Sequence, residues 1–210
     1  MSTSALRTSS QGPTDLRTFV RTTLDLGDVS LWPWSQDAAR CPGMLDGIIT
    51  AAADPLISVW NPLPASNRKS ALRWLETREE GWECGTQASF AAMTVTDDVL
   101  LGNVTLQWVD RADGRAMISY WFLPLARGRG IATRATTAVT RWAFRSSGAR
   151  RIELTHAVGN EASCRVAERC GYRPEGTLRQ ARRLGDGAYH DGHLHARLVA
   201  DPDPAGAPAA

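Results

Sequence analysis

The segment Phe122-Leu-Pro-Leu-Ala-Arg-Gly-Arg-Gly-Ile-Ala-Thr133 carries the strongest structural signal in this chain of 210 residues. An expected strand ends there, Gly128 and Gly130 permit a tight turn, and a helical pattern begins. The unpaired N–H groups and the dipole at a helix start favour an anion. Arg127 and Arg129 add positive charge and hydrogen-bond donors. The segment therefore predicts a phosphate-binding turn, with an ordinary strand-to-helix turn as the alternative.

Two familiar phosphate-binding motifs fit this turn poorly. A Walker A loop ends in Gly-Lys followed by Ser or Thr, and the segment has no such ending. A dinucleotide fingerprint needs a third glycine where Thr133 stands. The turn also follows three expected antiparallel strands, whereas a dinucleotide turn opens the first strand–helix–strand unit of its fold.

Apolar patterning around the turn predicts alternating strands and helices. A helix at 131–146 separates the strand at 116–122 from the strand at 151–156, so these two strands belong to a crossover connection and the later one must run parallel to an earlier one. The sequence therefore predicts one mixed α/β or α+β domain with helices packed on a sheet. Further strands are expected at 29–34, 89–95, 99–108, 172–182 and 192–199, and further helices after Ser35, at 67–80 (with Leu72, Trp74 and Leu75 on one face) and at 160–170.

Length and composition agree with a single globular domain. Hydrophobic residues make up 43% and charged residues 22% of the chain, which is close to the average for such proteins. We expect the domain at 28–200, after a partly disordered extension at 1–27 with a short helix at 16–24, and before a disordered tail at 201–210.

No apolar run is long enough to cross a membrane, and the N-terminus lacks the apolar core of a secretory signal, so we expect a cytoplasmic location.

Charge and ligand-type residues exclude several functions. A net charge of +2 is small for a nucleic-acid-binding protein, so nucleic acid is a disfavoured partner. The four cysteines form no CxxC pair and are expected to be free thiols. His193 and His195 share one strand face near His190, but nothing else of ligand type has matching spacing. We therefore expect no metal.

A specific resemblance starts from the same turn. Arg127-Gly-Arg-Gly-Ile-Ala132 resembles the Gln/Arg-x-x-Gly-x-Gly/Ala motif of the GNAT acyltransferase superfamily. The stretch from Asn160 to Gly176 resembles a conserved block of its RimJ/RimL branch, which acetylates protein N-termini and assorted small amines. The resemblance implies the GNAT fold: a central, mostly antiparallel twisted sheet with a splayed parallel strand pair and helices on both faces.

The same resemblance implies a donor and its binding residues. The implied donor is acetyl-CoA or a related acyl-CoA. The implied acceptor is a primary amine, either a protein N-terminus or a small molecule, that attacks directly. The pantetheine arm is expected near the backbone of Phe122 and Leu123, and Asn160 is expected either to bond that arm or to cap its helix. A homodimer is a further expected state. The pyrophosphate is expected on the amides of Arg127, Gly128, Arg129, Gly130, Ile131, Ala132 and Thr133.

Acetyl transfer also needs a proton source for the departing thiolate. Many GNAT enzymes use a tyrosine at the position of Ala167 here. The RimL type carries a serine at the position of Ser163, so the resemblance makes Ser163 the candidate acid or hydrogen-bond donor to the thiolate. Its alternative role is that of a first-turn residue satisfying local backbone.

The general base is less well defined. Acidic residues of many relatives are missing at Met117 or Ser119 and at Arg134. His156 is a candidate proton relay because an imidazole titrates near neutral pH, and Glu83 is a weaker candidate. The alternative is that water takes the proton and positioning supplies much of the rate.

The missing acid and base motivate a second function, that of a non-catalytic acyl-CoA-binding or regulatory module. An RNA-binding protein is disfavoured by the low net charge. Tryptophans crowd the half of the chain that shapes the acceptor pocket in the family, so they predict either an aromatic pocket or ordinary core packing. These residues are Trp32, Trp34, Trp60, Trp74 and Trp82.

Overall fold

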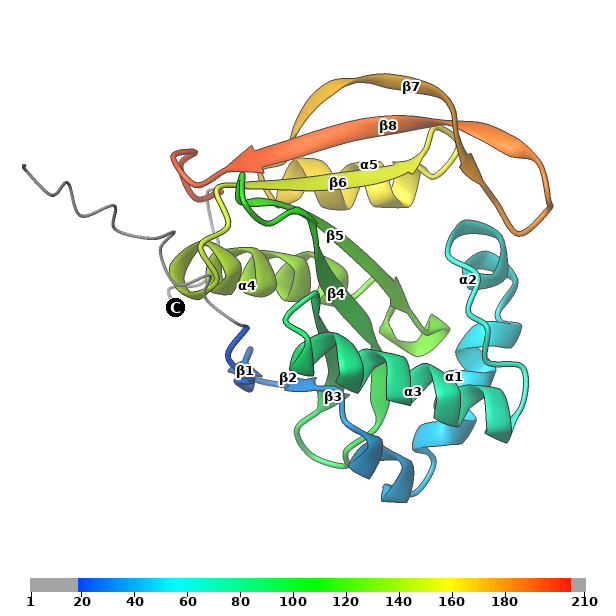
Figure 1. Cartoon of the computed structure of the whole chain (residues 1–210). Coiled ribbons are helices and arrows are strands. Elements are labelled where there is room, and N and C mark those ends of the chain that lie inside the picture. The colour runs from blue at the N-terminus through cyan, green and yellow to red at the C-terminus, as the bar shows by residue number, and fades with distance from the viewer. Residues whose placement is uncertain (1–18, 205–210) are drawn as a thin grey trace, which may run out of the picture.

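A twisted sheet of eight strands runs through the computed structural model, which describes residues 19–204 (Figure 1). The strands follow the order β1-β2-β3-β4-β5-β6-β8-β7. In the described chain β5 and β6 form the one parallel pair, which confirms the mostly antiparallel sheet. Their bounds are β1 Leu24–Asp25, β2 Val29–Pro33, β3 Gln87–Thr94, β4 Leu100–Asp110, β5 Arg115–Phe122, β6 Arg151–Ala157, β7 Arg173–Arg183 and β8 Tyr189–Leu198.

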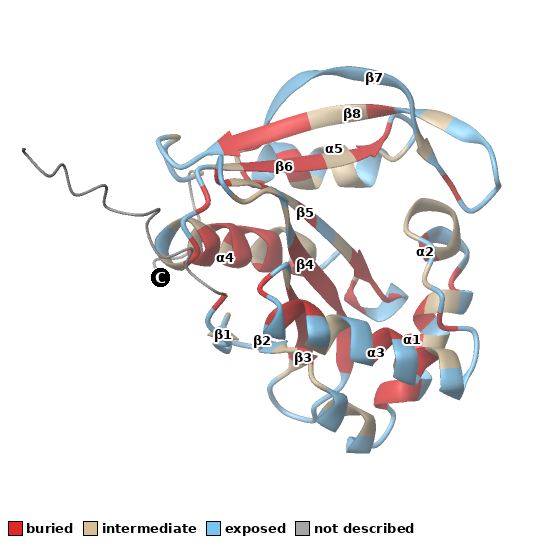
Figure 2. Cartoon of the chain, in the orientation of Figure 1, coloured by how far each residue is buried: buried red, intermediate tan, exposed pale blue. Residues whose placement is uncertain are grey.

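Five α-helices cover both faces of this sheet, as expected (Figure 2). Side chains of a strand alternate between its faces. On β3, Phe90 and Ala92 belong to the apolar cluster that contains α4, whereas Ala91 and Met93 belong to the cluster that contains α1 and α3. None of the helices between residues 19 and 204 is long and apolar enough to cross a membrane. The helices are α1 Met44–Ala53, α2 Pro55–Trp60, α3 Arg68–Glu83, α4 Ile131–Ser146 and α5 Glu161–Arg169.

A pair of capping side chains explains where α3 begins. Asn67 and Ser70 cap α3 reciprocally through two bonds of 3.0 Å, which is a capping box. Of the expected α3 face, Trp74 and Leu75 are buried, but Leu72 is 38% exposed. The helix expected after Ser35 is a 3-10 turn at Gln36–Arg40 without a side-chain cap.

The parallel strands β5 and β6 separate soon after they meet. They pair at Arg115–Arg151, Ala116–Ile152 and Met117–Glu153. Beyond that point β5 continues to Phe122 and β6 to Ala157 without pairing to each other. The splayed pair implied by the resemblance is therefore present, and the gap opens at the carboxyl ends of both strands.

The turn between β7 and β8 packs on α2, as Figure 1 shows at one end of the sheet. The amide of Gly185 donates to the carbonyl oxygen of Val59 at 3.0 Å. A Cβ atom at Gly185 would lie 1.8 Å from the carbonyl oxygen of Ser58, so only glycine permits this approach. Neighbouring Leu184 is buried. Segments far apart in the sequence thus meet at this end of the sheet.

The domain core begins before the expected boundary at residue 28. Phe19 is 5% exposed and stacks on Trp108 at a centroid distance of 5.3 Å. Residues 19–23 form no helix, and 24–25 form β1, so the described part of the expected helix at 16–24 is not helical. Residues 1–18 lie outside the described chain.

The start of the expected tail is also part of the domain. Arg197 is 2% exposed, and its guanidinium donates to Asp203 at 2.6 Å. Asp203 also accepts from Arg141 at 3.1 Å. These bonds lower the pKa of Asp203, that from Arg197 first and that from Arg141 second. Residues 205–210 of the expected tail lie outside the described chain.

We expect Asp203→Ala to lower the free energy of unfolding by about 1–3 kcal/mol, because a buried guanidinium loses its carboxylate. Because the folded pKa of Asp203 is depressed, this stabilisation is present above the pKa of an unfolded aspartate and is lost as pH falls through the folded pKa. Urea unfolding at neutral and acidic pH measures both effects. Asp113→Ala, at an exposed turn residue, is the control, and equal losses in the two variants would contradict the assignment.

Candidate active site

A cleft of about 590 Å³ lies where β5 and β6 separate. Its wall combines the end of β5, the glycine-rich turn, the first turns of α4 and α5, and α2. Leu123, Arg129 and His156, which were expected at the site, do not line it. Among the expected residues, those on the wall are Phe122, Arg127, Gly128, Gly130, Ile131, Ala132, Thr133, Asn160 and Ser163.

The glycine-rich turn has the geometry of an anion cradle. Gly128 and Gly130 have φ angles of 74° and 71°, a region that favours glycine. Gly130 is the N-cap of α4 and supplies no side-chain cap, so the first helical amides are left to bind a ligand. A Cβ atom at either glycine would meet nothing within 4 Å. Both glycines therefore face open space, and the turn lines the cleft, which suits a pyrophosphate.

The end of β5 presents backbone groups to the gap. The amide of Leu123 donates to Leu101 of β4 at 2.9 Å. Adjacent residues of a strand point their N–H groups to opposite sides, so the amide of Phe122 points away from β4 and into the gap. The side chain of Leu123 is buried in the cluster with α1 and α3. Phe122 thus fits its expected place, whereas Leu123 has its amide already bonded.

Arg127 stabilises the turn through hydrogen bonds within the protein. Its guanidinium donates to the carboxylate of Asp54 at 2.6 Å and to the carbonyl oxygen of Phe122 at 3.1 Å. Burial raises the pKa of Asp54, but bonds from Arg127 and from the amides of Ile57 and Leu56 outweigh it, so the pKa lies below its usual value. Asp54 in turn caps α2. The sequence motif therefore ties the turn to the cleft's opposite wall.

Asn160 caps α5 by accepting from the amide of Ser163 at 3.1 Å. The helix-cap role expected as its alternative is therefore present. The cap uses the oxygen of the side chain, so the Nδ2 group is not needed for it. Because Asn160 also lines the cleft, capping and ligand binding are compatible in one residue.

Ser163 has a partner that sequence reasoning missed. The hydroxyl of Tyr120 donates to the Ser163 oxygen at 3.1 Å. Burial is the main reason that the pKa of Tyr120 is raised, so the phenol stays protonated and keeps donating. The proton of Ser163 is then available to a ligand. Period-two alternation on β5 puts Tyr120 on the same side as Phe122, and this was the available signal.

His156 lies beside the cleft rather than in it. It lines a hollow of about 50 Å³, which shares Tyr120 and Ser163 with the cleft. Its Nδ1 is 2.9 Å from the Ala157 carbonyl oxygen, and its Nε2 is 3.2 Å from Nε2 of His195. Its ring faces Ala157 and His195 rather than the cleft, which argues against the expected proton relay.

Glu83, the weaker candidate for the base, also lies outside the cleft. It is exposed at the end of α3 and is not among the residues that line the cleft. The carboxylate residue on the cleft wall is Glu161, an exposed residue of the first turn of α5. Within residues 19–204, the cleft wall therefore offers no buried carboxylate as a base.

Most of the clustered tryptophans pack in the core. Trp34, Trp74 and Trp82 are buried in the two apolar clusters. Trp32 is partly exposed and donates to Ser30. Trp60 is the member of this group that lines the cleft and the adjoining hollow. The other aromatic residues on the described cleft wall, Tyr120, Trp121 and Phe122, come from β5.

A parallel strand pair that parts beside an uncapped, glycine-rich helix start defines the class of acyltransferase that the sequence resembles. The family model described as "Acetyltransferase (GNAT) domain" matches residues 42–173, more than half of the chain. The chain therefore belongs to the GNAT acetyltransferase family.

Similar proteins agree with the RimJ/RimL type. YdaF of Bacillus subtilis, whose name as a ribosomal N-acetyltransferase is provisional, is 32% identical over 62% of this chain and 69% of its own. The ribosomal-protein-serine acetyltransferase of Escherichia coli is 34% identical over 51% of this chain and 59% of its own. RimL, a ribosomal alpha-N-protein acetyltransferase solved with coenzyme A, has a TM-score of 0.76 at 21% identity and covers 86% of this chain and 100% of its own.

We expect Arg127→Ala to lower the free energy of unfolding by about 1–3 kcal/mol, because Asp54 stays buried without its charged partner. Arg129→Ala is the matched control, since Arg129 is exposed and makes a 3.4 Å contact to the Leu125 carbonyl oxygen. Its expected loss is within about 0.5 kcal/mol. Chemical unfolding of both variants measures the two losses of stability. Indistinguishable unfolding midpoints would show that the ion pair between Arg127 and Asp54 does not stabilise the fold.

Proposed function

We propose that this chain transfers an acetyl group from acetyl-CoA to a primary amine by direct attack, without a covalent enzyme intermediate. The observation that carries the proposal is the open cradle of amides at the start of α4, facing the gap between β5 and β6. The coenzyme A bound to RimL, which shares this fold, supports the same choice of donor.

The cradle and the end of β5 hold the donor. The backbone amides from Gly128 to Thr133 receive the pyrophosphate, and the amide of Phe122 and the side chain of Asn160 receive the pantetheine arm. Arg127 keeps this turn in place through Asp54. Acetyl-CoA supplies the activated acyl group as a thioester.

Ser163 serves as the hydrogen-bond donor or acid at the departing sulfur. Tyr120 donates to the Ser163 oxygen, which directs the serine proton outward and strengthens its donation, because linked hydrogen bonds polarise each other. Asn160 fixes the same turn through the Ser163 amide. Solvent takes the proton of the amine, since the cleft wall within residues 19–204 holds no buried carboxylate. Positioning then supplies much of the rate.

The acceptor we favour is the terminal amine of a protein. Relatives named for ribosomal proteins support this class, and a small-molecule amine is the second candidate. We place the acceptor beside Trp60, which lines both the cleft and the adjoining hollow. The homodimer and the cytoplasmic location stay predictions.

Calorimetric titration with acetyl-CoA tests the donor site. We expect micromolar binding by the wild type and its loss in Gly130→Glu, because a carboxylate would fill the cradle and oppose the pyrophosphate. Gly148→Glu is a matched control: Gly148 is also exposed, has a φ of 81° and has an open Cβ direction, but lies beyond the other end of α4. No binding by the folded wild type, or equal loss in both variants, would refute the cradle.

Steady-state kinetics with acceptor peptides test Ser163. We expect Ser163→Ala to lower kcat by about 10²–10⁴-fold with near-normal binding of acetyl-CoA. Tyr120→Phe should cause a smaller loss, and the double variant should match Ser163→Ala because the tyrosine acts through the serine. Full activity of Ser163→Ala would exclude this role. A protein that binds acetyl-CoA but acetylates no amine would instead be the non-catalytic module.

A further inference from the structure

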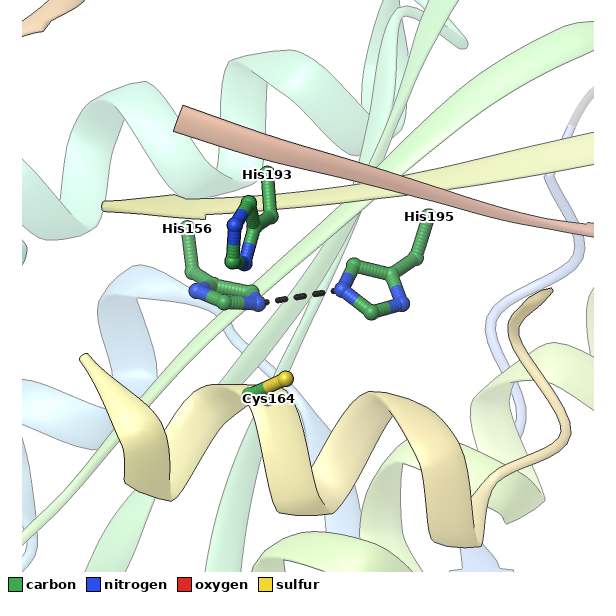
Figure 3. Close-up of side chains that lie close together, drawn as sticks. All are labelled: His156, Cys164, His193 and His195. Atoms are coloured by element: carbon green, nitrogen blue, oxygen red, sulfur yellow. Dashed lines mark hydrogen bonds between the residues drawn. The ribbon is translucent and has the colours of Figure 1, made fainter. Parts of the chain in front are cut away.

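Four side chains of metal-ligand type converge beside the cleft. His156 of β6, His193 and His195 of β8, and Cys164 of α5 place one ligand atom each within 4.8 Å of one another. Figure 3 shows the three imidazoles on the strands and the Cys164 sulfur directed toward them from the helix. His156 and His195 are 4% and 2% exposed, while the other two residues are half-buried.

Strand register explains why the histidines meet. His193 and His195 are two residues apart on β8, so they share a face. His156 stands directly opposite His193 in the antiparallel pairing of β6 with β8, and directly opposed residues point to the same side. Helix α5 covers this face and adds Cys164. The sequence pattern showed two of the four groups, and the fold supplies the others.

The ring nitrogens of the two buried histidines are arranged as metal ligands. Nδ1 of His156 faces the Ala157 carbonyl oxygen at 2.9 Å, and Nδ1 of His195 faces that of Tyr172 at 3.4 Å. A nitrogen that faces a carbonyl oxygen carries the proton, so both Nε2 atoms present lone pairs. These lone pairs face each other at 3.2 Å. Two lone pairs at this distance call for a cation between them, either a proton or a metal ion.

We propose that His156, Cys164, His193 and His195 form a tetrahedral zinc site. Zinc bonds imidazole nitrogen at about 2.0–2.1 Å and thiolate at about 2.3 Å, which separates the ligand nitrogens of a tetrahedron by about 3.3 Å. The separation of 3.2 Å between the Nε2 atoms of His156 and His195 already fits. Backbone carbonyls behind Nδ1 are the usual outer partners of zinc-bound histidines.

The protonation of the four side chains and a neighbouring carboxylate affect metal binding at this site. Zinc binds imidazole in its neutral form and cysteine as the thiolate. The Cys164 thiol donates to the carboxylate of Glu168 at 3.8 Å, and metal binding would displace this proton. The half-buried Cys164 and His193 leave a path for the ion to enter.

A zinc ion here would join β6 and β8 to the first turns of α5. Cys164 follows Ser163, so the metal would fix the turn that carries the proposed proton donor. The acetyl transfer proposed above uses none of the four ligands for chemistry. The site is therefore structural, and it stands or falls independently of the acetyl-CoA cleft.

Cobalt titration of the full chain tests this site. The protein is dialysed against chelator under reducing conditions, titrated with Co²⁺ alone, and then competed with Zn²⁺. We expect one equivalent to bind with the visible bands of tetrahedral cobalt and a thiolate-to-cobalt charge-transfer band. Zinc should displace the cobalt and raise the Tm, because a ligand that binds the folded state stabilises it.

Matched variants assign the ligands. Cys164→Ser should abolish the charge-transfer band, and Cys164→Ser and His193→Gln should each weaken cobalt binding by about tenfold or more. The controls are Cys84→Ser, at an exposed cysteine, and His190→Gln, at a histidine paired with Asp186 outside the cluster. Circular dichroism verifies folding. Absence of tetrahedral bands in the wild type, or bands unchanged in both ligand variants, would overturn the proposal, whereas acetyl-CoA calorimetry would be unaffected.

Discussion

The separation of β5 from β6 after three residue pairs is the constraint on which the rest of the site depends. Two parallel strands that stayed paired would satisfy each other's backbone groups and leave no room between them. Because they part beyond Met117 and Glu153, the cleft opens at their carboxyl ends. The turn after β5 and the start of α5 after β6 then face each other across it.

Separating two strands within a sheet costs free energy unless other groups replace the backbone hydrogen bonds that the strands lose. On the open side of β5, Arg127 donates to the carbonyl oxygen of Phe122, and the side chain of Asn61 donates to that of Tyr120. Asp54 then holds Arg127. The first helices are thus part of the cleft's construction, although their sequence carries no recognisable site motif.

Much of this arrangement was readable from the sequence, for identifiable reasons. The turn from Arg127 to Thr133 and the helix after it are local features, and glycine spacing and apolar period specify them. Tyr120 as the partner of Ser163, and His156 as the partner of His195, depend on which strands and helices become neighbours. The sequence predicted Phe19 in a short helix of the N-terminal extension and Asp203 in a disordered tail, because their contacts lie with residues far away in the chain. The apolar pattern of the sequence did not specify which residues far apart in the chain would come into contact.

The close contact of Gly185 with α2 has a consequence for how such a scaffold diversifies. The cleft is lined by β5, α2 and the first turns of α4 and α5, and the turn between β7 and β8 touches α2 through backbone atoms. A longer or shorter turn there would move α2 without disturbing the amides at Gly130. The wall formed by α2 and the glycine-rich turn are therefore held by different contacts, and a sequence change in one can leave the other intact.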